Sequence, residues 1–93
     1  MTKHEYLLTC YAEECMEVAQ RIHKALRFGI DDTYEGMTVR ESIDYEFNDL
    51  LAVAYMCAAE GLVLASLDRE AIAAKQAKVL KWLEYARERG TLT

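Results

Sequence analysis

Residues 7–22 read LLTCYAEECMEVAQRI, and apolar residues return in this stretch every three or four positions. That period is typical of one face of an α-helix, so it predicts a helix from about residue 3 to residue 28. Gly29 follows directly and is a suitable residue to end the helix. The expected apolar stripe consists of Leu7, Leu8, Tyr11, Cys15, Val18, Ala19, Ile22 and Leu26.

Two more helices follow from similar signals. The run Thr38-Val39-Arg40-Glu41 has the form of a capping box, which predicts a second helix from there to about Glu60. A third helix is expected to begin at Ser66 or Asp68 and to end near Arg89. Residues 29–37 are expected to form a loop and residues 62–67 an apolar connector, and no strands are predicted. The predicted class is therefore all-α: one domain over residues 1–93, built as a small antiparallel helical bundle of three long helices plus a short connector and completed by oligomerisation.

The composition narrows the classes of function. A net charge of −5 over 93 residues disfavours general binding to nucleic acids or to anionic membranes, because both need a cationic face. The three cysteines form no CxxC pair, which indicates buried free thiols in a reducing compartment. Neither a leader segment nor a membrane span is recognisable, so a cytoplasmic location is expected.

Two short acidic motifs contain the candidate site residues. Glu14 and Glu17 are three residues apart in the first helix, as Glu46 and Asp49 are in the second, and Glu13 directly precedes the first pair. This spacing places both carboxylates of a pair on one helix face, at the boundary of the apolar stripe. If the two helices pack side by side, four carboxylates converge and repel one another unless a cation lies between them. The arrangement predicts a divalent metal site of the kind that handles phosphate.

A structural alternative stays open at this point. Glu17 and Arg21 are four residues apart and could form a surface ion pair, and Glu46 could pair with a residue of another helix. Other metal chemistries fit less well, because His4 and His23 lack cysteine partners at zinc spacing and no Glu precedes either by three residues. No phosphate-binding glycine loop or nucleophile motif is present.

Basic and aromatic residues are candidates for binding the rest of a phosphate-containing ligand such as a nucleotide. By charge and placement, the candidates for binding the distal phosphates of a nucleotide are Lys24, Arg27, Lys75 and Lys78. Four aromatic residues could stack on a base, although at their spacing core packing is the commoner role: Tyr45, Tyr55, Trp82 and Tyr85.

The pattern Glu13-Glu14-x-x-Glu17 followed by Glu46-x-x-Asp49 resembles the signature of the all-α nucleoside triphosphate pyrophosphohydrolases, the MazG-like superfamily. The neighbouring segments 12–15, 24–29 and 49–53 are similar to those of short, stand-alone members from phages and bacteria. The resemblance covers about residues 5–58 and, more weakly, the third helix. The chain starts close to the first acidic motif, so the extra N-terminal helix of many such proteins is expected to be missing.

The resemblance implies Mg²⁺-dependent cleavage, with Mn²⁺ as a possible substitute, of a nucleoside triphosphate to the monophosphate and pyrophosphate. It implies Glu14, Glu17, Glu46 and Asp49 as metal ligands, and Glu13 with Glu14 as catalytic residues. It also implies a homodimer or homotetramer, in which another subunit could complete the nucleotide pocket. The alternative is a non-catalytic helical module for oligomerisation or interaction, with a vestigial acidic site.

Overall fold

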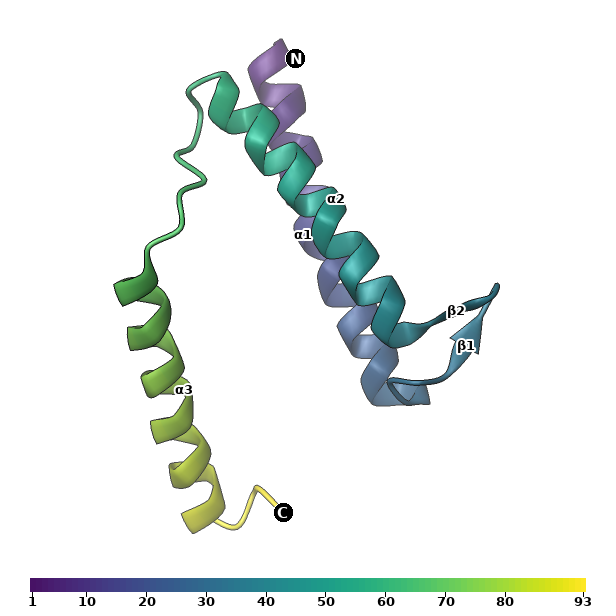
Figure 1. The fold of residues 1–93 in the computed structure, drawn as a ribbon, viewed down its shortest axis with the longest axis vertical. Coiled ribbons are helices and arrows are strands. Elements are labelled where there is room, and N and C mark those ends of the chain that lie inside the picture. The colour runs from purple at the N-terminus through teal and green to yellow at the C-terminus, as the bar shows by residue number, and fades with distance from the viewer.

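The computed structural model describes residues 1–93, and three helices account for most of them (Figure 1). Helix α1 spans Lys3–Phe28, α2 spans Val39–Ala59 and α3 spans Arg69–Glu88. The expectation of a mostly helical chain is confirmed, and the predicted helix boundaries lie within about three residues of the observed ones. None of the helices combines the length and apolar character needed to cross a bilayer.

Capping explains why the helices begin and end where they do. At the start of α2 the Thr38 hydroxyl accepts the backbone N–H of Glu41 at 3.1 Å, and the Glu41 carboxylate accepts the backbone N–H of Thr38 at 3.3 Å. The same reciprocal pair joins Thr2 to Glu5 at the start of α1. Gly29 ends α1 with a φ of 98°, a value that glycine adopts without steric cost.

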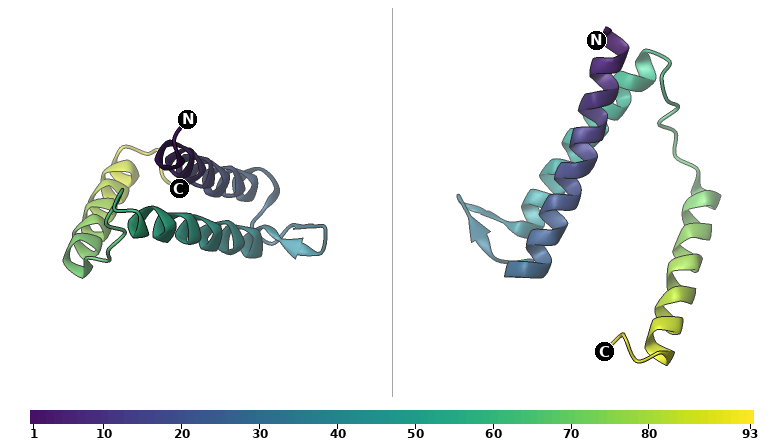
Figure 2. Two further views of the ribbon diagram at one scale, coloured as in Figure 1. Left: turned by 90° about the horizontal axis from the view of Figure 1, so that it is seen from above. Right: turned by 180° about the vertical axis from the view of Figure 1, so that it is seen from behind.

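Helices α1 and α2 lie side by side and antiparallel, and their contact forms the core (Figures 1 and 2). The apolar residues buried there are Leu7, Val39, Ala54 and Cys57. Cys57 is fully buried, and its thiol donates to the backbone carbonyl of Leu7 at 3.6 Å. Burial is therefore confirmed for this cysteine, whereas Cys10 is half-buried and Cys15 is exposed; all three are free thiols.

The prediction that residues 29–37 form only a loop is wrong in one respect. Strand β1, Thr33–Tyr34, pairs in antiparallel fashion with β2, Met37–Thr38, to make a small hairpin at one end of the helix pair. Glu35 and Gly36 connect the strands with φ values of 52° and 80°. Positive φ at both positions gives a turn whose twist matches that of the flanking strands, so even strands of two residues can pair.

Helix α3 stands apart from the helix pair, to which an extended connector joins it (Figures 1 and 2). A single chain therefore contains an antiparallel pair, and the third helix of the expected bundle does not pack against it. The apolar stripe expected on α1 is also only partly covered. Leu7 is buried, whereas Ile22 is 46% exposed and Leu26 is 79% exposed.

The chain buries few residues for its size. Only 5 of 93 residues are buried, and the accessible surface is 7570 Å². A compact monomer of 10.7 kDa would expose about 5,500 Å². The radius of gyration is 16.7 Å, whereas a compact domain of this length would have about 12 Å. Large apolar areas of the helices consequently face outward.

The capping box of α2 gives a test of local stability. Thr38→Ala removes the hydroxyl that accepts the Glu41 N–H, so the free energy of unfolding should fall by about 1 kcal/mol. Urea unfolding followed by circular dichroism, at one fixed protein concentration, measures the change. Thr38→Ser keeps the hydroxyl and should retain most of the stability. Equal stability of the parent and the alanine variant would show that the cap contributes nothing.

Candidate functional site

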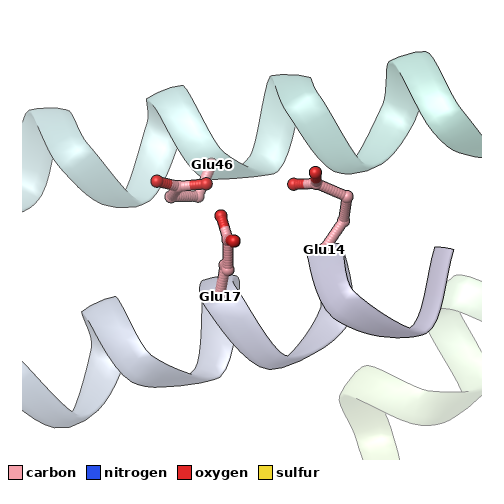
Figure 3. A group of neighbouring side chains, drawn as sticks. All are labelled: Glu14, Glu17 and Glu46. Carbon is pink, nitrogen blue, oxygen red and sulfur yellow. The ribbon is translucent and has the colours of Figure 1, made fainter. Parts of the chain in front are cut away.

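The acidic centre lies where α1 and α2 face each other near the middle of their contact. Glu14 and Glu17 extend from α1 toward α2, and Glu46 extends from α2 toward them (Figure 3). One carboxylate oxygen from each of these residues lies within 4.8 Å of the others. The structure therefore brings together three of the four predicted metal ligands, as their spacing on the two helices requires.

Glu46 is the most deeply placed member of this centre. It is 7% exposed, whereas the sequence predicted a boundary position, half in and half out. That prediction is wrong because the antiparallel register directs Glu46 into the contact with α1 rather than along its edge. Its Oε2 atom is buried without a hydrogen-bond partner, and the same is true of Oε2 of Glu14. Buried carboxylate oxygens without partners are costly, so both residues lower the stability of the contact between the helices.

The pKa values of both residues reflect this cost. Burial raises the pKa of Glu46 above its ordinary value of 4.5, and the adjoining Glu17 carboxylate and Asp49 raise it further, while Arg21 lowers it. Burial also raises the pKa of Glu14, with further contributions from Glu17, Asp49 and Glu13. In both cases the environment disfavours the charged form, through burial first and through neighbouring carboxylates second.

Arg21 supplies the nearest positive charge. Its guanidinium lies 3.6 Å from the Glu46 carboxylate, across the contact between the helices. This contact confirms one part of the structural alternative, in which Glu46 pairs with a residue of another helix. One guanidinium does not neutralise three carboxylates, and the Nε atom of Arg21 is itself buried without a partner. The ion pair therefore lessens the repulsion without removing it.

The other two acidic residues of the predicted site lie at its margin. Asp49 is half-buried and close enough to raise the pKa of both Glu14 and Glu46, although it lies outside the compact group of three oxygens. Glu13 is exposed on α1 beside that group. These positions leave Asp49 near enough to approach a shared ion and Glu13 free of structural contacts.

The donor set fits a hard divalent cation. Ions such as Mg²⁺ prefer carboxylate oxygens, and two oxygens on opposite sides of one Mg²⁺ lie about 4.2 Å apart. Among three ligands of one octahedral ion at least two pairs are neighbours, about 3.0 Å apart. The three oxygens lie within 4.8 Å of one another, so the side chains would have to move closer to share one ion. The unpartnered oxygens of Glu14 and Glu46 are the atoms that such an ion would satisfy.

A pocket of about 590 Å³ begins beside this centre and continues to the hairpin. Glu46 and Arg21 line it at the acidic centre, and Lys24 lines it one turn of α1 further along. Aromatic and hairpin residues line the rest: Phe28, Asp32, Tyr34, Glu35, Met37, Thr38, Val39, Ser42 and Tyr45. Among the residues that line the pocket, Lys24, Tyr45 and Glu46 were predicted from the sequence as site residues.

Two signals in the sequence could have revealed this pocket. Arg21, Lys24 and Phe28 continue the Glu14–Glu17 spacing of three and four residues, so all five share one face of α1. The pair Glu35-Gly36 between Thr33-Tyr34 and Met37-Thr38 resembles a two-residue hairpin connection. Because each strand has only two residues, its alternation is too short to recognise without the helices on either side.

The remaining predicted phosphate-binding residues lie elsewhere in a single chain. The Arg27 guanidinium lies over the Phe28 ring, 5.1 Å from its centroid, and Arg27 does not line the pocket. Lys75 and Lys78 are exposed on α3, away from the helix pair. Among the aromatic candidates only Tyr45 lines the pocket. The other three, Tyr55, Trp82 and Tyr85, are each at least half exposed, so none occupies a core within one chain.

These features define an acidic centre between two helices, beside a pocket lined by basic, acidic and aromatic residues. The chain matches no protein-family model, no curated protein and no solved structure.

The raised pKa of Glu46 predicts how stability depends on pH. As pH rises above about 4.5, the unfolded carboxyl ionises before the folded one, so this residue lowers stability progressively toward neutral pH. Glu46→Gln removes that loss. In metal-free buffer the variant should be more stable than the parent at pH 7, with a smaller difference at pH 4.

Thermal unfolding across this pH range measures the effect, with Glu88→Gln, an exposed position on α3, as the matched control. Lower stability of Glu46→Gln at every pH would show that the ion pair with Arg21 outweighs the repulsion. The cluster would then be structural.

Proposed function

We propose that the chain is a Mg²⁺-dependent nucleotide pyrophosphohydrolase that converts a nucleoside triphosphate to the monophosphate and pyrophosphate. The observation that carries the proposal is the group formed by Glu14, Glu17 and Glu46, in which the buried Oε2 atoms of Glu14 and Glu46 lack partners. Glu46 also lines one end of a pocket. The resemblance of the acidic motifs to those of all-α pyrophosphohydrolases supports the same activity. A cytoplasmic location, where nucleoside triphosphates are available and thiols stay reduced, is part of the proposal.

The order of side chains along the pocket supports a nucleotide as ligand. Along one face of α1, carboxylates come first, then Arg21 and Lys24, then the ring of Phe28. From Glu17 to Phe28 the helix rises about 16 Å, a length comparable to that of an extended nucleoside triphosphate. A metal-bound triphosphate at the carboxylates would thus place its base among the aromatic residues.

Each group has a distinct proposed role. Glu14, Glu17 and Glu46 would hold the ion, and Asp49 would complete the set. Bound Mg²⁺ would neutralise phosphate oxygens and lower the pKa of a coordinated water. Arg21 and Lys24 would bind phosphate oxygens that the ion does not contact. Glu13 is exposed and has no structural contact, so it is the proposed acceptor of the proton from the attacking water.

The products test this activity directly. With Mg²⁺ present, at least one nucleoside triphosphate should yield its monophosphate and pyrophosphate in equal amounts, measured by ion-exchange chromatography. Glu17→Gln and Asp49→Asn should each lower kcat/KM by about 100-fold, because even the outer partners of metal ligands contribute 10- to 100-fold. Helical content should not change.

Glu88→Gln serves as the control variant and should retain full activity. Release of orthophosphate with diphosphate as the other product would contradict the proposal. No turnover of any natural or modified nucleotide, together with no rise in melting temperature on adding Mg²⁺, would instead favour the non-catalytic helical module.

We also propose that a second copy of the chain covers the open faces, which would complete the expected antiparallel bundle as a homodimer or homotetramer. The surface in excess of that of a compact monomer is about 2,000 Å² per chain. Two chains would together bury about twice that area, which lies within the range of obligate homodimers. The apolar face of α3, formed by Ile72, Val79, Leu83 and Ala86, supplies part of this interface. In such an assembly Lys75 and Lys78 could reach the acidic centre of a neighbouring chain.

Light scattering coupled to gel filtration tests this assembly. The parent should elute with the mass of a dimer or tetramer at micromolar concentration. Val79→Glu places a charge within the apolar face of α3 and should shift the mass toward the monomer. Lys81→Glu, on the opposite face of the same helix, is the matched control and should leave the mass unchanged. A monomeric parent with full activity would overturn the proposal.

A further inference from the structure

We propose that two hairpin carboxylates, Asp32 and Glu35, make the pocket selective for nucleotides whose base carries an exocyclic amino group. The inference rests on the proposed function for the position of the phosphates. It concerns a different part of the pocket, at the end away from the acidic centre, where both residues line the wall.

The pocket has a clear polarity. Glu46 and Arg21 mark one end, where the Glu46 side chain is buried and its Oε2 atom is unpartnered. Phe28 is the last residue of α1, and the hairpin follows it, so Asp32 and Glu35 lie toward the opposite end. A nucleotide with its phosphates at Arg21 would therefore present the edge of its base to the hairpin.

The rings in this part of the pocket suit the face of a base. Phe28, Tyr34 and Tyr45 line the wall, and Tyr34 and Tyr45 are respectively 71% and 59% exposed. Such rings offer flat apolar surface on which any base can stack, and stacking does not distinguish one base from another. Selectivity must come from the polar groups beside the rings.

Asp32 is held in place but has no side-chain partner. Its backbone carbonyl accepts the N–H of Val39 at 2.9 Å, and its backbone N–H donates to Gly29 at 3.2 Å. The neighbouring Asp31 differs, because its carboxylate binds the Arg40 guanidinium through two contacts of 3.1 and 3.3 Å. Asp31 does not line the pocket. Of the two adjacent aspartates, Asp31 is therefore paired, and Asp32 remains available to a ligand.

Glu35 occupies a backbone position that glutamate seldom adopts. Its φ is 52°, in the left-handed region that favours glycine, asparagine or aspartate. The side chain forms no hydrogen bond or ion pair within the chain, so no internal contact explains a glutamate there. Its position in the pocket wall gives the side chain a use that the turn itself does not require.

The chemistry of the two residues determines which bases they can bind. An ionised carboxylate only accepts hydrogen bonds. The amino groups of cytosine and adenine donate, and carboxylates accept from the N4 amino group of cytosine in other recognition sites. Uracil and hypoxanthine carry a carbonyl oxygen at the corresponding position, so they would place an acceptor against an acceptor.

Paired nucleotides that exchange the amino group for a carbonyl oxygen, with a hydrogen added to the adjacent ring nitrogen, provide the test. Binding is measured by calorimetry with Mg²⁺ and the α,β-methylene analogues of the triphosphates, which cannot be cleaved between the α- and β-phosphates. The cytidine analogue should bind about tenfold more tightly than the uridine analogue, and the adenosine analogue more tightly than the inosine analogue. Equal affinity, preference for the carbonyl bases, or no binding of any analogue would each overturn the inference.

The variants assign the preference to the two residues. Asp32→Asn and Glu35→Gln each replace an acceptor with a group that also donates, so the cytidine-to-uridine ratio should fall severalfold toward one. Asp31→Asn is the matched control and should keep the parent ratio. Circular dichroism checks that the variants retain their helical content. A tenfold ratio that survives in the double variant Asp32→Asn/Glu35→Gln would place the selectivity elsewhere and overturn the assignment.

Failure of the inference and failure of the proposed function give different results. Release of pyrophosphate from cytidine and uridine triphosphates at equal rates, together with equal binding, would overturn base selection and leave the activity intact. Selective binding of the amino bases without pyrophosphate release from any of them would support the hairpin as a recognition element and contradict the activity.

Discussion

The burial of one charged side chain against like charges is the constraint on which the site depends. Glu46 extends from α2 into the contact with α1, where Glu14 and Glu17 extend toward it. Placing carboxylates there costs free energy, and the raised pKa values of Glu14 and Glu46 reflect that cost. Arg21 offsets part of it from 3.6 Å away. A residue chosen for packing alone would be apolar at this position, so the carboxylate lowers stability there, and the proposed cation would offset that cost.

The same antiparallel register determines which residues continue from the acidic centre along the pocket. Since side chains three and four residues apart share a helix face, the stripe that begins with Glu14 and Glu17 continues through Arg21 and Lys24 to Phe28. On α2 the order runs in the opposite direction, from Asp49 and Glu46 toward Ser42 and Val39. The two stripes meet level by level, and the hairpin closes the far end. Helix geometry thus orders the acidic and basic residues, and the hairpin adds Asp32, Tyr34 and Glu35 to the pocket wall.

Much of this could be predicted from the sequence, for identifiable reasons. The helix boundaries followed from Thr38 with Glu41, from Asp68 and from Gly29, because caps are local signals. The grouping of Glu14, Glu17 and Glu46 followed from spacing, but the depth of Glu46 did not, because depth depends on the register between helices. The hairpin was missed because strands of two residues carry almost no pattern. The separate position of α3 could not be predicted, since an amphipathic face indicates that a helix packs without indicating against what.

The small number of buried residues has a consequence for how much of this protein is folded at any moment. With five buried residues and an extended outline, the single chain makes little of the favourable apolar contact that a compact domain would make. If identical chains supply that contact, the equilibrium between folded and unfolded material includes protein concentration as a variable. Dilution would then melt the structure as heat does. The quantity of the protein present, rather than a separate regulator, would set the fraction that carries a formed acidic centre.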